Sequence, residues 1–455
     1  MSKNHIDMTS GPILPKLIKF ALPLILSSVL QLLFNAADVV VVGRYAGDNS
    51  LAAVGSTSSL VNILVNFFLG LGVGCNVVAA NFLGAGRKDD VNRTVHTTIM
   101  LSFIGGLLLT LVGLCFSRQI LILMSSPKDV LPLSTLYLKV FFSGITATVV
   151  YNFGAALLRA KGDTKRPLYI LLIAGLINVI LNLIFVICFN MDVAGVALAT
   201  VLSQLFSAVC IIILLIKEDD CFHLDFKKIH IDREILLRVI KIGLPAGLQG
   251  VIFSFSNIVI QSSVNSFGAI RVAGNSAAQS IEGFVYISMN GFSQGTLTFA
   301  GQNMGAHRFD RIKKLAFISQ FSVVVVGIVL GYAAFILGPR LLSIYSQNES
   351  VVESGMLRLS VILVTYFTCG MMDCMASIIR GIGHSLMPMI VTLIGACGLR
   401  MLYIFTVFRI PRFHTFQSIF YSYPLSWVVT FTFLTISFIW LIKKAAPKDS
   451  LSSAN

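Results

Sequence analysis

Long apolar segments recur along the whole chain, and each could cross a lipid bilayer as a helix. A helix that spans the hydrocarbon core needs about 20 apolar residues, because lipid cannot hydrogen-bond to the backbone. Charged residues make up only 12% of the chain, against about 25% in soluble proteins. We therefore predict an all-α integral membrane protein with twelve transmembrane helices, at residues 14–42, 52–83, 95–116, 134–158, 168–189, 193–216, 235–267, 272–304, 314–338, 355–379, 386–408 and 417–442.

The second half of the chain repeats the first, with an offset of 221 or 222 residues. The segment GAGR at residues 84–87 returns as GAHR at 305–308, and LRAKGDTKRP at 158–167 returns as IRGIGHSLMP at 379–388. The first span also has a copy, in which Lys19, Leu22, Pro23 and Asn35 recur as Lys241, Leu244, Pro245 and Asn257. Identities that keep one phase over such distances indicate an internal duplication.

The duplication predicts two lobes of six spans each. Residues 1–216 form the predicted N-lobe, residues 217–234 a cytoplasmic linker and residues 235–455 the C-lobe. Because six is an even number, both copies enter the membrane from the same side, as a parallel internal repeat. Lobes of this kind are related by an axis along the membrane normal, and we expect the substrate route between them.

The positive charge of the chain sets its predicted orientation. The net charge is +14, and 24 of the 34 Lys and Arg residues lie in segments that are cytoplasmic when the N-terminus is inside. Cytoplasmic loops of membrane proteins carry this excess of Lys and Arg. We therefore expect a multi-pass protein of the cell (cytoplasmic) membrane with both termini in the cytoplasm. Since topology explains the basic excess, the expected partners are the bilayer and a small-molecule substrate, with no nucleic acid.

Asp38 lies inside the first apolar stretch, Leu22–Val42, whereas Ile260 stands at its position in the second copy. A carboxylate in hydrocarbon is expensive, so it usually faces a cavity and marks an ion or proton pathway. It can hold Na⁺ while ionised, or carry a proton if burial favours its neutral form. A carboxylate that is hydrogen-bonded for structure alone is the other interpretation. We favour ion coupling, because intramembrane acids usually serve ion pathways.

Further polar side chains lie in the first-half spans. Asn178 and Asn182 are four residues apart, so they share one face of the fifth span. Thr200 lies in the sixth span, and Tyr137 and Asn152 lie in the fourth. All can supply oxygen ligands to a small hard cation or hydrogen bonds to a neutral acid. Hydrogen bonds that only join neighbouring helices are an equally good explanation of these residues taken alone.

The second half carries three ionisable groups inside its spans, namely Glu282, Asp373 and Arg400. Such groups are costly in a membrane unless they are paired or hydrated. One interpretation is a static ion pair of Arg400 with Asp373 or Glu282. The other is a second proton relay or a cation-binding wall. We favour a static or gating pair, because pairing offsets the cost of burial.

Sequence motifs of enzymes are absent from the chain. It has no Walker A loop, no HExxH and no GxSxG, and its eight Cys residues show no CxxC or Cys/His metal spacing. We therefore expect a protein that is not an enzyme and needs no cofactor. Without ATP hydrolysis, transport must be driven by an ion gradient or run downhill.

The pattern Pro23-x7-Gln31-x6-Asp38-x4-Gly43-Arg44, the GAGR loop and the duplicated segments at 158–167 and 379–388 resemble the multidrug and toxic compound extrusion (MATE) family. The resemblance extends from about residue 14 to residue 444 and is nearest to the bacterial DinF and NorM types. It implies a monomer of two six-helix lobes that exports organic, often cationic and amphipathic compounds in exchange for Na⁺ or H⁺.

The resemblance also assigns site residues. The family's first-helix acid matches Asp38, and its Thr on the sixth helix matches Thr200. Its Asn and acid on the fifth helix match Asn178 and Asn182, so an amide replaces a carboxylate here. Tyr137 and Asn152 match its Tyr and Asn on the fourth helix, and Asp38 and Asn178 would be ligands if Na⁺ binds. A lipid or lipid-linked oligosaccharide flippase of the same superfamily is the alternative function.

Overall fold

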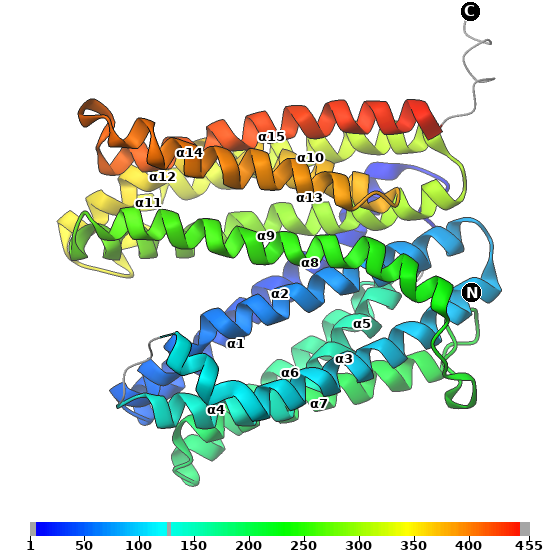
Figure 1. Cartoon of the computed structure of the whole chain (residues 1–455), viewed down its shortest axis with the longest axis horizontal. Coiled ribbons are helices and arrows are strands. Elements are labelled where there is room, and N and C mark those ends of the chain that lie inside the picture. The colour runs from blue at the N-terminus through cyan, green and yellow to red at the C-terminus, as the bar shows by residue number, and fades with distance from the viewer. Residues whose placement is uncertain (1–5, 125–128, 446–455) are drawn as a thin grey trace, which may run out of the picture. The chain divides into compact units, whose positions relative to one another are not determined.

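The computed structural model describes residues 6–124 and 129–445, and within these ranges the chain is helical and contains no strand. Figure 1 shows the helices, which in chain order are α1 (Ile13–Tyr45), α2 (Asp48–Gly84), α3 (Lys88–Leu123), α4 (Leu131–Ser143), α5 (Ile145–Lys161), α6 (Lys165–Leu183), α7 (Asp192–Ile216), α8 (Arg233–Asn265), α9 (Ala269–Gly305), α10 (Phe309–Ile336), α11 (Gly338–Ser343), α12 (Glu349–Gly381), α13 (Leu386–Thr392), α14 (Leu399–Phe405) and α15 (Phe416–Ala445). Two π-helical segments, Ile184–Cys188 and Leu393–Gly398, follow α6 and α13. Short 3₁₀ turns lie at Phe226–Lys228, Val407–Arg409 and Pro411–Phe413.

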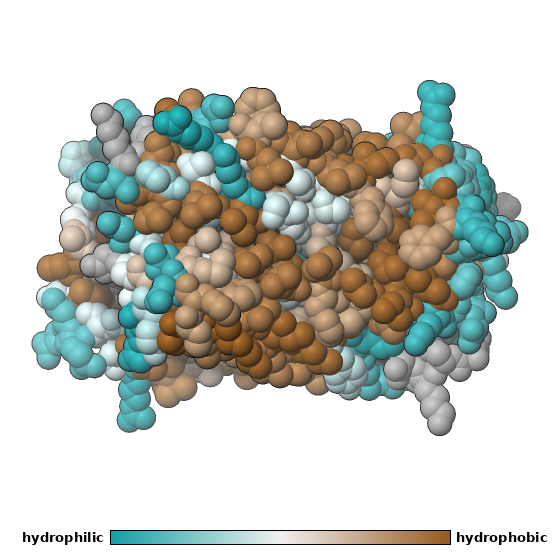
Figure 2. Space-filling model, turned by 90° about the horizontal axis from the view of Figure 1, so that it is seen from below, coloured by the Kyte–Doolittle hydropathy of each residue, from teal (hydrophilic) through white to brown (hydrophobic). Residues whose placement is uncertain are grey.

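Hydropathy identifies the helices that can span a membrane. Ten of the described helical segments are long and apolar enough, and α4 with α5 forms one further span that bends by 47°. One long helix, α9, is not among these spans. It is more polar than the others, because it carries Arg271, Glu282 and several amide side chains. On the face shown in Figure 2, apolar side chains cover the middle and hydrophilic side chains gather at both ends, as a membrane protein requires.

The predicted fourth span, 134–158, is broken at Gly144, which separates α4 from α5. A Cβ at Gly144 would collide with the side chain of Val201 on α7. The missing side chain therefore lets the bend press against α7. A glycine inside a helix is also a weak point, where bending is least costly.

Contacts divide the chain into two compact units. Unit 1 comprises Leu26–Gly247 together with the described residues up to Asp7, and unit 2 comprises Met8–Ile25 together with the described residues from Leu248 onward. The first half of α1 is therefore part of unit 2, and the first half of α8 is part of unit 1. Pro23 and Pro245 lie within three residues of these changes of unit. The predicted lobe boundaries describe the sequence repeat, and they stay a prediction.

Glycines allow close packing of the first half of α8 in unit 1 and of the first half of α1 in unit 2. In unit 1, a Cβ on Gly70 of α2 would collide with the backbone of Gly247 on α8. In unit 2, the equivalent glycine is Gly291 of α9, 221 residues later. A Cβ there would collide with the side chain of Ile25 on α1. Small residues at helix contacts allow close backbone approach in membranes. The repeated sequence thus produces the same packing in both units.

Candidate functional site

Asp38 and Asn182 meet inside unit 1. Asp38 is half-buried on α1, and Asn182 is buried on α6. The amide nitrogen Nδ2 of Asn182 donates a hydrogen bond to Asp38 Oδ1. The same nitrogen lies 3.4 Å from Asn178 Oδ1, so the two asparagines also contact each other along one face of α6. The predicted sharing of a face by Asn178 and Asn182 is therefore present in the structure.

The polar contacts continue from α6 to α7. Asn178 Nδ2 donates to Thr200 Oγ1 at 3.3 Å, and Thr200 Oγ1 donates to the carbonyl of Val196 at 3.0 Å. The amide of Asn178 thus accepts from Asn182 and donates to Thr200. The result is a chain of hydrogen bonds with the Asp38 carboxylate at one end and a backbone carbonyl at the other. We name Asp38, Asn178, Asn182 and Thr200 the acid cluster.

One atom of the acid cluster has no partner. Asn182 is 1% exposed, and its Oδ1 is buried without a hydrogen bond. A buried acceptor without a donor costs about 1–3 kcal/mol, so such atoms are uncommon. A proton carried by Asp38, or a cation beside it, would supply the missing interaction. In the described residues no three His, Cys, Asp or Glu side chains gather for a metal ion. A Na⁺ ion would therefore need the amide and hydroxyl oxygens of the acid cluster as well as Asp38.

The other two predicted residues of the first half differ in their surroundings. Tyr137 on α4 packs against an apolar cluster that includes Val41 and Val42 of α1, close along the helix to Asp38. Asn152 on α5 donates from Nδ2 to Thr148 O at 2.8 Å, a bond within its own helix. Tyr137 thus borders the acid cluster, whereas the hydrogen bond of Asn152 stays within α5.

Gly175 positions α1 beside the acid cluster. A Cβ at Gly175 of α6 would overlap the ring of Phe34 on α1. Phe34 precedes Asp38 by one helical turn, and Gly175 precedes Asn178 by nearly one turn, so both pairs share a helix face. The ring of Phe34 therefore occupies the space that Gly175 leaves. This contact holds α1 close enough to α6 for Asn182 to reach Asp38.

Unit 2 contains a buried ion pair with a different partner from the one predicted. Glu282 on α9 accepts from Arg358 on α12, with Nε–Oε1 at 2.8 Å and Nη2–Oε2 at 2.7 Å. Arg358 Nη1 also donates to Asn275 Oδ1 at 2.8 Å. Glu282 lies in a buried ion pair, as predicted, but the prediction of Arg400 as its partner is wrong. That the pair is static stays a prediction. Pairing depends on how α9 and α12 are rotated against each other, which the sequence does not give.

Asp373 and Arg400 form no ion pair with each other in the described residues, so that predicted alternative is also wrong. Asp373 Oδ2 accepts from the hydroxyl of Tyr286 at 3.1 Å. Arg400 Nε donates to Ser426 Oγ at 3.0 Å, and its guanidinium lies 4.2 Å from the centre of the Tyr423 ring. The three predicted ionisable groups of the second half therefore have three different hydrogen-bond partners.

Sequence reasoning missed Arg358, which lies at the outer edge of the predicted span 355–379. A charged side chain near the end of a span is expected to be hydrated, so Arg358 did not stand out as a buried group. The signal was nevertheless present, because Arg358 lies 221 residues after Tyr137, a residue already selected in the first half.

Comparison with known proteins identifies the family. The family model MatE matches residues 23–184 and again residues 245–406. The chain belongs to the MatE family. The two matches also confirm the predicted duplication, and the resemblance to the multidrug and toxic compound extrusion family is confirmed.

The relatives and solved structures agree with this assignment. The chain is 25% identical over 434 residues to the "Probable multidrug resistance protein YoeA" of Bacillus subtilis, covering 93% of this chain and 94% of the relative. It is 28% identical over 403 residues to YpnP of the same organism, also named a probable multidrug resistance protein, with 87% and 88% covered. A solved structure of an outward-facing "multidrug resistance MATE family transporter of the MOP superfamily" has a TM-score of 0.89, at 21% identity and 98% and 99% coverage. This MatE protein is thus a multi-pass membrane transporter of twelve helices in two lobes, and not an enzyme.

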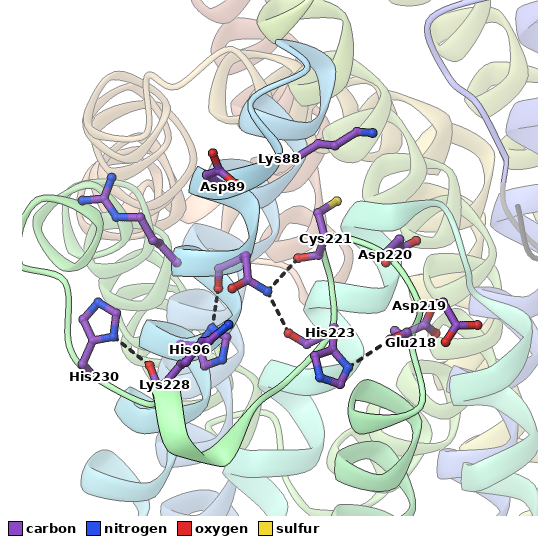
Figure 3. A pocket seen from close by; sticks show the side chains of 12 residues that line it. Lys88, Asp89, His96, Glu218, Asp219, Asp220, Cys221, His223, Lys228 and His230 are labelled. Atoms are coloured by element: carbon purple, nitrogen blue, oxygen red, sulfur yellow. Dashed lines mark hydrogen bonds between the residues drawn. The ribbon is translucent and has the colours of Figure 1, made fainter.

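This MatE protein also has a cavity of about 850 Å³ at the N-terminal end of α3. Figure 3 shows that its walls come from the first turns of α3 and from the segment between α7 and α8. Asn92 Nδ2 donates to the carbonyls of Cys221 and His223, at 3.3 and 2.8 Å, and so joins the two walls. The lining contains both acidic side chains, such as Asp89 and Glu218, and basic ones, such as Lys88 and Lys228, so charges of both signs border the cavity.

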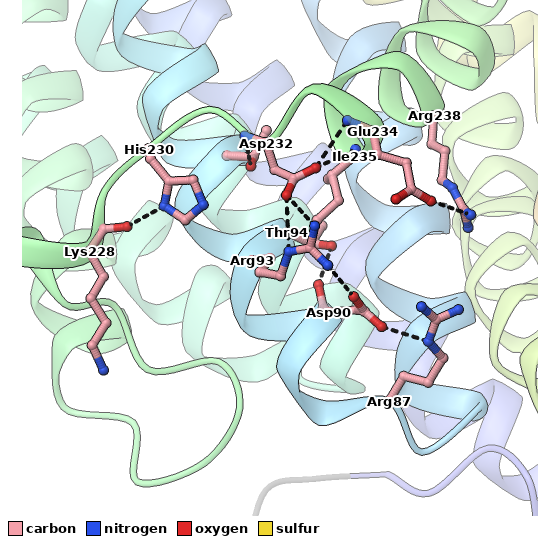
Figure 4. A network of polar contacts seen from close by, with 11 residues as sticks. Arg87, Asp90, Arg93, Thr94, Lys228, His230, Asp232, Glu234, Ile235 and Arg238 are labelled. Atoms are coloured by element: carbon pink, nitrogen blue, oxygen red, sulfur yellow. Dashed lines mark hydrogen bonds and ion pairs between the residues drawn. The ribbon is translucent and has the colours of Figure 1, made fainter.

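The same segment is fixed to α3 by the ion pair between Arg93 and Asp232 (Figure 4). Asp232 accepts from Arg93, and its Oδ1 also accepts from the backbone N–H groups of Glu234 and Ile235 at 3.0 and 3.1 Å. Asp232 therefore caps the N-terminus of α8. The N–H of Ile235 and the guanidinium of Arg93 stabilise the carboxylate and hold the pKa of Asp232 below its usual value.

Proposed function

We propose that the protein is a secondary active antiporter that exports organic, cationic amphipathic compounds in exchange for Na⁺ or H⁺. The names of its relatives support drug export, since they are multidrug resistance proteins. The acid cluster supports ion coupling. In this proposal the protein works as a monomer in the cytoplasmic membrane, with both termini in the cytoplasm and no cofactor.

The observation that carries the proposal is the Asp38 carboxylate beside the unpartnered oxygen of Asn182. An external proton or Na⁺ that reaches Asp38 neutralises the carboxylate and gives Asn182 Oδ1 a partner. A cation therefore has a specific reason to bind here, because it satisfies two groups that are otherwise poorly satisfied in a membrane.

Binding at Asp38 can drive transport only if the ion binds one conformation of the protein more tightly than another. The acid cluster joins α1, α6 and α7, so neutralising Asp38 changes the contacts among these three helices. The proposed cycle begins with ion binding from outside and repacking of these helices, followed by release of the substrate outward. The protein then turns inward, where the ion leaves and a new substrate binds, as alternating access requires.

Transport of a fluorescent organic cation into everted vesicles tests the proposal. A Na⁺ gradient and a pH gradient are imposed separately on vesicles with wild type or with Asp38→Asn. We expect one gradient to drive uptake by the wild type and at least a tenfold loss in Asp38→Asn. The gradient that works identifies the coupling ion. Absence of uptake with a broad panel of dyes, or normal uptake by Asp38→Asn, would contradict the proposal.

A flippase for lipids or lipid-linked oligosaccharides is the second candidate. The buried guanidinium groups of Arg358 and Arg400 favour it, since such substrates are anionic. Glu282 already neutralises Arg358, however, which leaves a single unpaired guanidinium of the two. A flippase would move a fluorescent lipid across proteoliposomes without any ion gradient, whereas the proposed antiporter would not.

A further inference from the structure

The two MatE repeats place different side chains at equivalent positions. Arg358 lies 221 residues after Tyr137, and Arg400 lies 222 residues after Asn178, the offset that also relates the two family matches. The π-helical segment Leu393–Gly398 accounts for the change of offset, because a π-bulge accommodates one extra residue. Where unit 1 has a phenol and an amide near Asp38, unit 2 therefore has two guanidinium groups.

The two guanidinium groups meet at one aromatic ring. Arg358 lies 5.6 Å and Arg400 lies 4.2 Å from the centre of the Tyr423 ring. Tyr423 belongs to α15, the sixth span of its repeat, just as Thr200 belongs to the sixth span of the first repeat. The arrangement around Asn178 and Thr200 thus has a counterpart in unit 2 with the opposite charge.

Arg358 is already neutralised. Both oxygens of Glu282 accept from it, and Asn275 accepts from its remaining terminal nitrogen. Arg358, Glu282 and Asn275 are 4%, 4% and 0% exposed, so this network is closed and fully buried. A pair this complete has no capacity left for a ligand.

Arg400 is not neutralised. It is 3% exposed, and the hydrogen bond that the structure gives it runs from Nε to the neutral hydroxyl of Ser426. Within residues 6–124 and 129–445 no carboxylate forms an ion pair with it. A guanidinium is permanently charged and presents two terminal NH₂ groups besides Nε. Burial of such a charge in a membrane span is costly unless a counter-ion is present.

The nearby acid does not remove the excess charge. Asp373 accepts from Tyr286, and it lies seven residues before Arg380 on α12, so both point to the same side of that helix. Arg358, Arg380 and Arg400 in the spans of unit 2 face only two acids, Glu282 and Asp373. Three guanidinium groups thus share two carboxylates, and in the part of the chain that the structure describes Arg400 forms no ion pair with either of them.

We propose that Arg400 binds the carboxylate of an apolar organic compound. The guanidinium fork matches the two oxygens of a carboxylate. Trp427 lies 5.6 Å from the guanidinium, and Tyr366 lies 5.5 Å from Trp427, so an aromatic wall is present for the apolar body. The inference rests on the proposed function in taking this compound as a substrate, and it adds that transported compounds carry an acidic group besides any cationic one.

Intrinsic fluorescence can detect this binding, because the chain has two Trp residues, Trp427 and Trp440. Trp440 is 54% exposed and is replaced by Phe, which leaves Trp427 beside Arg400 as the sole reporter. The Trp440→Phe protein in nanodiscs is titrated with octanoate and with octanamide, which has the same shape without the charge. We expect a saturable change with octanoate at a concentration at least tenfold below any change with octanamide. Equal responses, or no response to octanoate, would overturn the inference without any further variant.

Two variants place the site. Arg400→Gln should weaken octanoate binding at least tenfold, whereas Arg409→Gln, which removes an exposed arginine from the same span, should leave it unchanged. Unchanged binding in Arg400→Gln would overturn the assignment to Arg400. Octanoate binding is measured without any gradient, whereas ion coupling is measured by uptake under a gradient. Failure of ion coupling and failure of anion binding are thereby separated.

Discussion

Unit 1 and unit 2 share a fold and differ in the charged side chains inside their spans. Unit 1 has a half-buried acid, Asp38, that accepts a hydrogen bond from the amide of Asn182. Unit 2 has a buried cation, Arg400, that lies over aromatic rings and forms no ion pair among the described residues. The helix contacts that the two units share are made by glycines such as Gly70 and Gly291. The comparison teaches that packing residues preserve the repeat, while the polar residues inside each unit have become specialised.

The segments that precede α8 and α1, the first helices of the two repeats, also differ in the groups that hold them. In unit 1 the carboxylate of Asp232 accepts from Arg93 of α3. In unit 2 Arg311 of α10 donates instead to backbone carbonyls, those of Met8, Ser10 and Gly11. Both contacts fix the segment before a span to the helix that begins beside it.

The largest effect is expected from breaking the buried pair of unit 2. Glu282→Gln leaves Arg358 charged and without its carboxylate, which should destabilise the protein by about 3–5 kcal/mol. Glu282→Gln combined with Arg358→Met removes both charges and should recover most of the loss. Thermal unfolding in detergent measures both variants. A single variant as stable as the wild type would show that unit 2 has no need of the pair.

Gly175 tests how closely unit 1 must hold α1. Gly175→Ala places a methyl group in the space of the Phe34 ring, and overpacking of this kind costs about 1–3 kcal/mol. Ion-driven uptake should fall as well, because α1 and Asp38 move away from Asn182. Gly72→Ala is the matched control, since its Cβ would lie 3.7 Å from the nearest atom, an ordinary contact. Equal behaviour of the two variants would remove Gly175 from the account.

Asn182 tests the hydrogen-bond chain of unit 1. Asn182→Leu removes the donor to Asp38 and should reduce ion-driven uptake about tenfold, equivalent to about 1.4 kcal/mol. Asn178→Leu, one step farther from the carboxylate, should have a smaller effect. Asn152→Leu serves as control, because Asn152 bonds within its own helix. If Asn152→Leu impairs uptake as strongly as Asn182→Leu, ion coupling also depends on residues outside the acid cluster.

The smallest effect concerns Asp232, which caps α8 in unit 1. Asp232→Ala removes an N-cap and should lower stability by about 1 kcal/mol, whereas Asp232→Asn, still a good cap, should lower it less. Because the pKa of Asp232 is lowered in the folded protein, its carboxylate stabilises the fold above the unfolded pKa and loses this effect as pH falls through the folded value. The difference in Tm between wild type and Asp232→Asn should therefore be present at pH 7 and shrink below about pH 4. A difference that stays constant with pH would mean that the charge of Asp232 is not involved.

The spans and the repeat could be read from the sequence, because hydrophobic length and phase-locked identities are properties of the chain alone. The partial exchange of α1 and α8 between the compact units could not. It depends on which glycines each half-helix packs against. The sequence does not show that Gly70 and Gly291 make these contacts, because it does not give the positions of the helices. The break at Gly144 was hidden for a similar reason, since Val201 lies 57 residues away.

The acid cluster was largely predictable and the pairs of unit 2 were not. Asn178 and Asn182 share a helix face by spacing alone, and Asp38 stands out by its charge. The pairing of Glu282 with Arg358 instead of Arg400 follows from helix rotation, which hydropathy does not specify. Comparison of the repeats at positions 137 and 358 would have drawn attention to Arg358, because a phenol there becomes a guanidinium.

The central claim is that Asp38 couples an ion to export in unit 1. The most direct measurement is ion movement in proteoliposomes, recorded with a pH-sensitive or a Na⁺-sensitive dye when an exported organic cation is added to one side. The account predicts that the substrate drives one ion the opposite way in the wild type and in Ile260→Val, a conservative change at the equivalent position of unit 2. It predicts no ion movement in Asp38→Asn. Substrate transport without ion movement in the wild type, or the same ion movement in Asp38→Asn, would contradict the account.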